Sequence, residues 1–253
     1  MEIKKDKLQE IENHLQNLER EKGITILHAV ESGSRAWGFP SLDSDYDVRI
    51  IYHHEHEWYI SPFEKKDNIE IPITDDLDIA GWDIGKTLSL LYKGNATVHE
   101  WLNSPIVYFS NQEKHSLLRD FAAKEFNAAP AFYHYISLTK RKFLEPQTQF
   151  NAKAYLYGLR ALLCANWIAD RNTAPPVLFE VLTKTYLDTN LKNELKIVLQ
   201  DKAKQKEKDA FAIPKNLWQY SLETYEQVSE SFSERKRQGK QSDYEQLLRK
   251  IVM

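Results

Sequence analysis

The sequence predicts an α+β protein whose strands are confined to the first half of the chain. Two observations predict this division. Short apolar runs rich in β-branched residues, typical of strands, occur at 24–32, 45–52, 69–73 and 77–82. After about residue 115 they give way to long amphipathic patterns with helical spacing. We therefore expect two domains, residues 1–122 and residues 123–253.

Helices and turns complete the first domain. Ile11, Leu15 and Leu18 recur at helical spacing and predict a helix over 3–22, which Gly23 ends. The other expected elements are a turn and short connector at 33–44, a turn at 74–76, a helix over 86–94, a shorter helix after it and an apolar run at 106–109.

The second domain is expected to be all helical. Amphipathic patterns predict a helix over 114–126, which crosses the expected boundary, and helices over 130–144, 151–171, 176–187, 190–206, 215–232 and 241–252. Two charged segments, 201–210 and 233–241, are typical of solvated helix ends or loops, although a basic run can also bind nucleic acid.

Composition limits the class of protein. The 253 residues are 28% charged and 42% hydrophobic, which is ordinary for a globular protein that can bury a core. Cys164 is the one cysteine, so no internal disulfide can form. The N-terminal residues are charged and lack the apolar segment of a signal peptide, and no apolar run reaches the length of a membrane span. We expect a cytoplasmic protein with no membrane partner.

Charge is divided unevenly between the two halves. Residues 1–122 carry 13 Lys and Arg against 22 Asp and Glu, a net charge of −9, and residues 123–253 carry 21 against 15, a net charge of +6. The two values sum to the −3 of the whole chain. An acidic half beside a basic half indicates a metal-holding part and an anion-holding part, although uneven surface charge is the simpler interpretation.

Two carboxylates, Asp45 and Asp47, stand one residue apart at the start of the second predicted strand. Because side chains alternate between the faces of a strand, Asp45, Asp47 and Arg49 are expected on one face. Neighbouring carboxylates repel each other, and burying them unpaired is costly. Mg²⁺, a hard cation that prefers oxygen ligands, relieves that conflict. Such pairs are also common at strand edges and turns.

A Gly-Ser turn and a third acid strengthen the metal interpretation. Gly33 and Ser34 follow the first predicted strand, where backbone N–H groups and a hydroxyl can approach a phosphate, although an ordinary turn has the same composition. Asp78, flanked by apolar residues at the start of a later strand, is the expected third acid. Asp83 precedes a predicted helix and is expected to be its N-cap.

These features follow the order and spacing of a known family. The segments "SGSRAWGFPSLDSDYDVRI" and "DLDIAG" resemble the motifs of the DNA polymerase β-like nucleotidyltransferase superfamily. The extended forms "GSRAWG", "SDYDVR" and "GWDIGKTLSLLYKGN" resemble one branch of it, the YcgL-like predicted bacterial nucleotidyltransferases, which includes RNA-repair-associated polymerases. The resemblance is strong over residues 24–110 and looser over the helical half.

The resemblance implies a small mixed β-sheet similar to the polymerase-β palm, followed by a helical domain. It also implies transfer of a nucleoside monophosphate from a nucleoside triphosphate such as ATP to a hydroxyl, with release of pyrophosphate. Asp45, Asp47 and Asp78 would hold two Mg²⁺ ions, which Mn²⁺ could replace. The base stays open, and so does the acceptor: an RNA 3′ end, a small molecule or a protein side chain.

Nucleotide-binding candidates come from both halves of the chain. Those in the first half are Gly33, Ser34, Arg35 and Arg49, and each arginine could instead form a structural ion pair. In the second half, Lys153, Tyr157 and Arg160 recur at i, i+4 and i+7 on one stripe of a largely apolar helix. Cations in a buried helix need an anion, which a triphosphate or a carboxylate could supply.

Two rival functions are compatible with the same motifs. A non-catalytic nucleotide- or RNA-binding module would keep the fold, but we would expect it to lose at least one of the three acids. An antidote that adenylylates a partner protein would keep the acids, but minimal proteins of that kind lack a helical half of this size.

Overall fold

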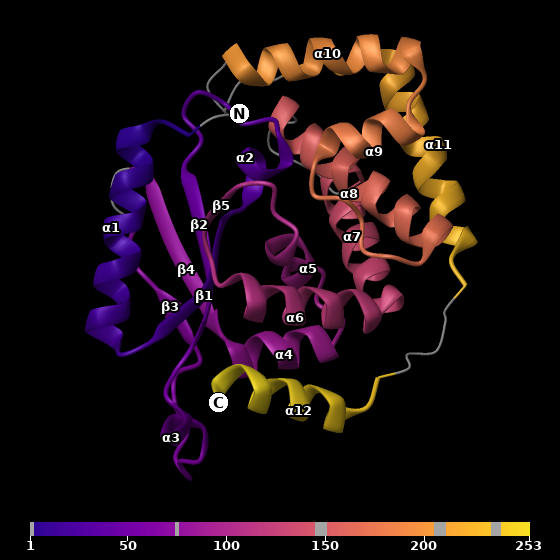
Figure 1. The fold of residues 1–253 in the computed structure, drawn as a ribbon. Coiled ribbons are helices and arrows are strands. Elements are labelled where there is room, and N and C mark those ends of the chain that lie inside the picture. Colours follow the sequence, from indigo (N-terminus) through magenta and orange to yellow (C-terminus); the bar gives the residue numbers. More distant parts are fainter. Residues whose placement is uncertain (1–2, 74–75, 145–150, 205–210, 234–238) are drawn as a thin grey trace. The chain divides into compact units, whose positions relative to one another are not determined.

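The computed structural model (Figure 1) describes residues 3–73, 76–144, 151–204, 211–233 and 239–253. The expected turn at 74–76 and the charged segments at 201–210 and 233–241 lie partly outside these residues. The chain divides into two compact units. Unit 1 contains Met1–Ala36, Asp45–Phe126 and Arg237–Met253, and unit 2 contains Trp37–Ser44 and Asn127–Lys236.

Neither unit is one continuous stretch, unlike the expected domains 1–122 and 123–253. The segment Trp37–Ser44 is grouped with unit 2, although the residues on both sides of it belong to unit 1. The C-terminal helix is grouped with unit 1, although the whole helical half precedes it. Both groupings depend on tertiary packing. The change from strand-like to helix-like patterns along the sequence does not reveal it.

Unit 1 is built on a mixed sheet, as the sequence predicts for an α+β fold. Its strands are β1 (Thr25–Glu31), β2 (Tyr46–His53), β3 (Asn68–Glu70), β4 (Leu77–Asp83) and β5 (Val107–Ser110). In the described residues they form one sheet in the order β3-β4-β2-β1-β5. Strands β2 and β4 run parallel, and the other neighbouring pairs are antiparallel.

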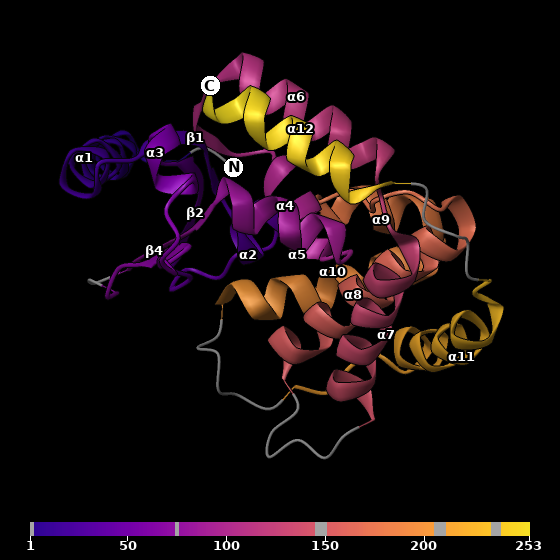
Figure 2. The same ribbon diagram turned by 90° about the horizontal axis from the view of Figure 1, so that it is seen from below.

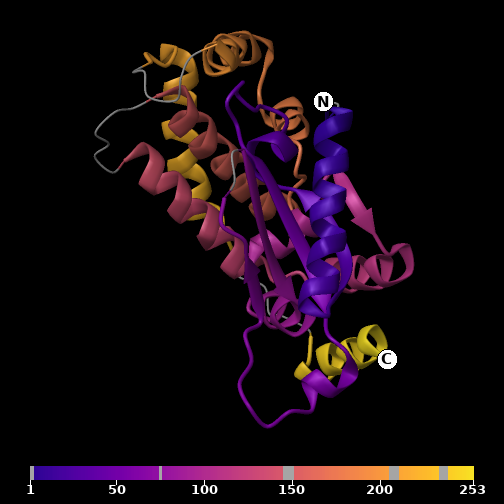
Figure 3. The same ribbon diagram turned by 90° about the vertical axis from the view of Figure 1, so that its left-hand side faces the viewer.

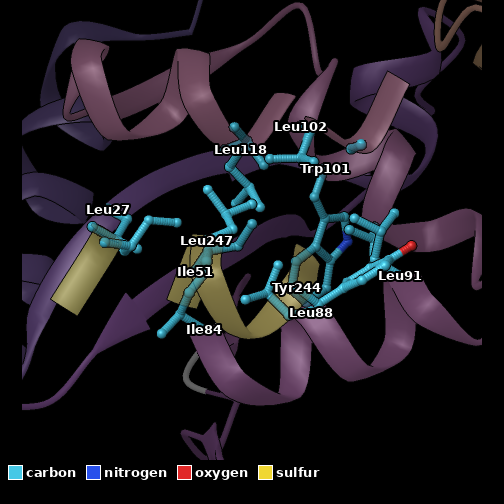
Figure 4. Packing of buried hydrophobic residues seen from close by; sticks show 14 residues of the cluster. Leu27, Ile51, Ile84, Leu88, Leu91, Trp101, Leu102, Leu118, Tyr244 and Leu247 are labelled. Atoms are coloured by element: carbon cyan, nitrogen blue, oxygen red, sulfur yellow. The ribbon is translucent and has the colours of Figure 1, made fainter. Parts of the chain in front are cut away.

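Helices cover both faces of this sheet. Helix α1 (Lys5–Lys22) lies along one face (Figure 3), where Ile11 and Leu15 pack in a core that includes Val48 and Ile50. The other face carries α4 (Ile84–Tyr92), α5 (Ala96–Leu102), α6 (Gln112–Lys124) and α12 (Gln241–Val252). Figure 4 shows the second core, in which side chains of these four helices meet Leu27 of β1 and Ile51 of β2. The short helices α2 (Gly33–Trp37) and α3 (His56–Tyr59) follow β1 and β2.

The C-terminal helix α12 joins unit 1 through a narrow apolar stripe. Tyr244, Leu247 and Ile251 are its buried residues, spaced three and four apart, and the partly buried Leu248 and Val252 pack against the same core. They belong to the same core as Leu88 and Leu91 of α4, and Figure 2 shows α12 beside α4. The helix predicted over 241–252 is therefore confirmed.

Unit 2 is helical, as expected. It contains α7 (Ala128–Phe143), α8 (Ala152–Arg171), α9 (Phe179–Tyr186), α10 (Thr189–Lys204) and α11 (Lys215–Ser231). Helix α8 is its centre, with most side chains buried. Gly158 permits the close packing of α7, because a Cβ atom there would lie 2.3 Å from the Phe143 ring. Among the described helices, none combines the length and the apolar character that crossing a membrane requires.

Candidate active site

Asp47 and Asp78 are neighbours across the parallel strands β2 and β4. The register pairs Asp47 directly with Asp78, as it pairs Ile51 with Trp82 further along. Strand alternation places both acids on the face of the sheet that also carries Ile51. The side chains are 32% and 26% exposed, so water and solutes reach them. The prediction that Asp78 lies on a strand beside the first acids is confirmed.

Arg49 joins the two carboxylates. It lies two residues after Asp47 on the same face of β2, and its Nη2 is 2.9 Å from Asp47 Oδ1 and 2.7 Å from Asp78 Oδ2. Its Nη1 donates to the backbone carbonyls of Val48 and Asp78, both at 3.1 Å. The guanidinium thus offsets the repulsion between two acids that the register forces together. Arg49 was predicted either to contact the nucleotide or to form a structural ion pair, and the structure shows the ion pair.

Gly33 lies against the carboxylate of Asp47. Its φ of +60° is in the left-handed region, and a Cβ atom there would lie 2.4 Å from Asp47 Oδ2. Only glycine combines this backbone conformation with so close an approach. The Gly-Ser turn therefore lies beside the acid pair, and Ser34, which follows Gly33 in α2, is buried.

Glu31 holds the backbone of Asp47 from the end of β1. Its side chain is fully buried. The Oε1 atom accepts a hydrogen bond from the Asp47 N–H at 2.9 Å, and Oε2 accepts one from the hydroxyl of Tyr108. Burial raises the pKa of the Glu31 carboxyl from 4.5 to about 7, although both hydrogen bonds favour its charged form.

Asp45 and Arg35 border the acid pair. Asp45 is exposed and immediately precedes β2. Arg35 Nε donates to the Asp45 backbone carbonyl at 3.0 Å, and its guanidinium lies 3.9 Å from the centre of the Tyr46 ring. Arg35 thereby fixes the main chain that enters β2.

Asp83 is the N-cap of α4, as predicted. Its Oδ1 accepts from the Gly85 N–H at 2.7 Å, and its Oδ2 accepts from the Tyr59 hydroxyl at 2.6 Å. The side chain is buried, and burial raises the pKa of its carboxyl. Its role as the N-cap of α4 accounts for the buried position of Asp83.

The donor chemistry of the acid pair fits a hard divalent cation. Carboxylate oxygens are ligands that Mg²⁺ prefers, and the ion pairs with Arg49 show that this pair attracts positive charge. In the described parts of the chain, no three carboxylate, imidazole or thiol groups are arranged to hold a metal ion together. The structure therefore brings together two of the three predicted acids, Asp47 and Asp78.

The stripe predicted on α8 faces aromatic side chains within unit 2. Lys153 Nζ lies 5.9 Å from the Tyr157 ring centre, and the two side chains are partly exposed. Arg160 is only 3% exposed; its guanidinium lies 4.2 Å from the Trp37 ring centre, and its Nη2 donates to the Val177 carbonyl at 3.4 Å. These contacts explain how a cation is accommodated in this helix.

Similarity to known proteins identifies the class as that of the DNA polymerase β-like nucleotidyltransferases. The chain belongs to the family described as the RNA repair pathway DNA polymerase beta family (RlaP), whose model matches residues 8–250. The resemblance seen in the motifs is thereby confirmed.

The chain also matches one relative over most of its length and one solved structure weakly. The "Uncharacterized protein YcgL" of Bacillus subtilis (strain 168) is 40% identical over 236 residues, which span 92% of this chain and 90% of that protein. A nucleotidyltransferase-like protein from Exiguobacterium sibiricum 255-15 matches 86% of this chain and 74% of its own, with 13% identity and a TM-score of 0.33. Family membership rests on the sequence matches.

Sequence reasoning missed the part that Glu31 and Tyr108 play beside Asp47. The sequence feature that could have indicated it is an acid at the end of the largely apolar run "ITILHAVE". A carboxylate at the end of a buried strand is shielded from solvent and needs partners within the protein. Nothing in the sequence pointed to Tyr108, because its hydroxyl reaches Glu31 only when β5 joins the sheet beside β1.

Proposed function

We propose that the protein is a metal-dependent nucleotidyltransferase that moves a nucleoside monophosphate from a nucleoside triphosphate to a hydroxyl acceptor, releasing pyrophosphate. The observation that supports this most is the in-register pairing of Asp47 and Asp78, with Gly33 against the Asp47 carboxylate. Family membership supports the same reaction class.

In this proposal the acids hold the metal and the Gly-Ser turn meets the phosphates. Asp47 and Asp78, with Asp45, would bind Mg²⁺ or Mn²⁺, which supplies Lewis-acid stabilisation of the charge that develops on the phosphate. Gly33 and Ser34 would contact the triphosphate beside Asp47. Arg49 keeps the two carboxylates oriented, and Arg35 steadies the strand entry at Asp45.

The stripe on α8 is proposed as the second phosphate-binding element. Lys153 and Tyr157 are partly exposed and lie close to each other, so they could meet a ligand from solvent. Arg160 is buried against Trp37, so it would support Lys153 and Tyr157 without meeting the ligand from solvent. The net charge of +6 on residues 123–253 favours an anionic substrate.

An RNA 3′ hydroxyl is the proposed acceptor, because the family is described as belonging to an RNA repair pathway. The two rivals give different products. A non-catalytic module would bind nucleotide or RNA without releasing pyrophosphate, and an adenylylating antidote would place the label on a protein. The retained acids and their pairing argue against the first of these.

One labelling experiment separates these functions. The purified protein is incubated with each α-³²P-labelled nucleoside triphosphate and Mg²⁺, with an RNA that ends in a 3′ hydroxyl or the same RNA blocked by a 3′ phosphate. We expect label on the unblocked RNA alone. Label on a protein from a cell extract would favour the antidote, and nucleotide binding without any transfer would favour the non-catalytic module.

A further inference from the structure

The carboxyl group of Glu31 is buried where a charged group is unfavourable. It ends β1, two residues before Gly33, and none of its surface is exposed. Burying a carboxyl is costly unless its oxygens have hydrogen-bond partners. The function proposed above assigns it no part.

Every polar group of Glu31 has a defined partner. Its Oε1 accepts from the Asp47 N–H at 2.9 Å, and its Oε2 accepts from the Tyr108 hydroxyl. Its own N–H donates to the Ile106 carbonyl at 3.0 Å, and its carbonyl accepts from Ser104 Oγ at 2.7 Å. The side chain is therefore held by β2 and β5, and the backbone of Glu31 is held by the segment that leads into β5.

These contacts fix Asp47 at the point where the β1–β2 ladder ends. Glu31 pairs with Val48, the last pair of the ladder. At the next residue, the Ser32 N–H donates to the Asp47 carbonyl at 2.9 Å, whereas the Asp47 N–H meets a side-chain oxygen. The Glu31 carboxyl thus takes the place of a backbone carbonyl and extends the ladder to the acid.

We propose that Glu31 is a positioning residue: its carboxyl holds the Asp47 backbone so that the Asp47 carboxylate stays opposite Asp78. Tyr108 acts on the other oxygen and prevents the carboxyl from turning away. The proposal rests on the proposed function of Asp47 as a metal ligand.

Two substitutions at Glu31 and one matched control test this role. Glu31→Met keeps much of the volume but removes the acceptor, and Glu31→Gln keeps an amide oxygen for the Asp47 N–H. Glu70→Met makes the same change at an exposed position of β3 in the same sheet. Each variant is measured for hydrogen exchange of the Asp47 amide, and for kcat and KM in nucleotide transfer.

The substitution Glu31→Met is expected to lower kcat and to leave KM nearly unchanged. In Glu31→Met, exchange of the Asp47 amide should accelerate and kcat should fall about tenfold, the size of effect that a lost buried hydrogen bond gives. The KM for the triphosphate should change less than about twofold, because the phosphate contacts remain. Glu31→Gln should restore kcat to within about threefold of the wild type, and Glu70→Met should match the wild type.

Failure of this proposal and failure of the proposed function give different results. Unchanged exchange of the Asp47 amide in Glu31→Met overturns the positioning role, as does faster exchange with unchanged kcat in an active protein. If the wild type transfers no nucleotide, the proposed function fails, and Mn²⁺ affinity replaces kcat as the readout. Weaker Mn²⁺ binding in Glu31→Met then supports positioning, and equal binding overturns it.

A second variant covers the case in which Glu31→Met does not fold. Tyr108→Phe keeps the ring and removes only the hydroxyl that holds Glu31 Oε2. It should lower kcat or Mn²⁺ affinity by about threefold, with a smaller rise in amide exchange at Asp47. A Tyr108→Phe protein equal to the wild type in all three measurements overturns the proposal.

Discussion

Asp47 and Asp78 face each other across the parallel pairing of β2 and β4, and one nitrogen of Arg49 lies within 2.9 Å of the first carboxylate and 2.7 Å of the second. The pairing is set by backbone register, so the backbones of the two acids stay opposite each other as long as the strands remain paired. A negative pair fixed in this way keeps its position whether or not a cation is bound.

Gly33→Ala should destabilise the protein more than Gly23→Ala does. Both glycines have a φ of +60°, so each alanine pays about 1 kcal/mol for the left-handed conformation. At Gly23 a Cβ atom meets nothing within 4 Å, whereas at Gly33 it lies 2.4 Å from Asp47 Oδ2. Urea unfolding should therefore show an additional loss of about 1–3 kcal/mol for Gly33→Ala. Equal losses would show that the approach to Asp47 carries no constraint.

Arg49→Met should destabilise the protein and make it more dependent on divalent cations. Without the guanidinium, the repulsion between Asp47 and Asp78 is no longer offset, at a cost of about 2 kcal/mol. Added Mg²⁺ should raise the melting temperature of this variant more than that of the wild type, because the ion replaces the lost positive charge. Lys86→Met, which breaks the more exposed pair with Asp67, is the control and should show no such gain. Equal responses of all three proteins to Mg²⁺ would contradict a cation site at the acid pair.

His99→Gln should make the free energy of unfolding depend less on pH below about 6.5. Burial lowers the pKa of His99 from 6.5 to about 4. Between these values the unfolded chain binds a proton that the folded protein does not, so stability falls as pH falls from 6.5 towards 4. The slope that His99 contributes is at most about 1.4 kcal/mol per pH unit. Urea unfolding at pH 7 and pH 5 should show a smaller difference in His99→Gln than in the wild type. His56→Gln, at an exposed position, is the control and should keep the wild-type difference.

Lys153→Met and Arg160→Met should have separable effects. Arg160 is buried over Trp37, so its loss should lower the unfolding free energy by about 1–2 kcal/mol. Lys153 is partly exposed, and its loss should leave stability unchanged while it weakens triphosphate binding more than monophosphate binding. Calorimetric titration with ATP and AMP measures both affinities. Equal losses for ATP and AMP in Lys153→Met, or none, would remove α8 from the phosphate site.

Local patterns were sufficient to predict most elements of the sheet and the helices. The strand predicted over 45–52 corresponds to β2 (Tyr46–His53), and alternation correctly places Asp47 and Arg49 on one face, although Asp45 lies just before the strand. Asp78 lies on a strand, as its apolar neighbours predict. Asp83 was identified as a cap because an acid directly before an apolar helical pattern has that local use. Each of these features depends on residues close together in the chain.

Features that depend on distant partners could not be predicted. The pairing of Asp47 with Asp78 requires the parallel register of strands about thirty residues apart, and the hydrogen bond from Tyr108 to Glu31 requires β5. The grouping of Trp37–Ser44 with the helical unit depends on contacts of Trp37 and Phe39 with Arg160 and Lys202. A cation on an apolar helix indicated only that some partner exists, and an aromatic face was not among those considered.

The most direct test of the central claim is the rate of nucleotide transfer by Asp47→Asn and Asp78→Asn in Mg²⁺, with Asp83→Asn as the control on the same strand as Asp78. Each of the first two variants should lose at least about 100-fold in kcat and remain folded, because each removes a charge and an oxygen donor that the metal needs. Asp83→Asn should keep the wild-type rate, because asparagine also caps helices and burial already disfavours the charged form of Asp83. A wild-type rate in Asp47→Asn or Asp78→Asn, or an equal loss in Asp83→Asn, would contradict the assignment of the facing acids as the centre of transfer.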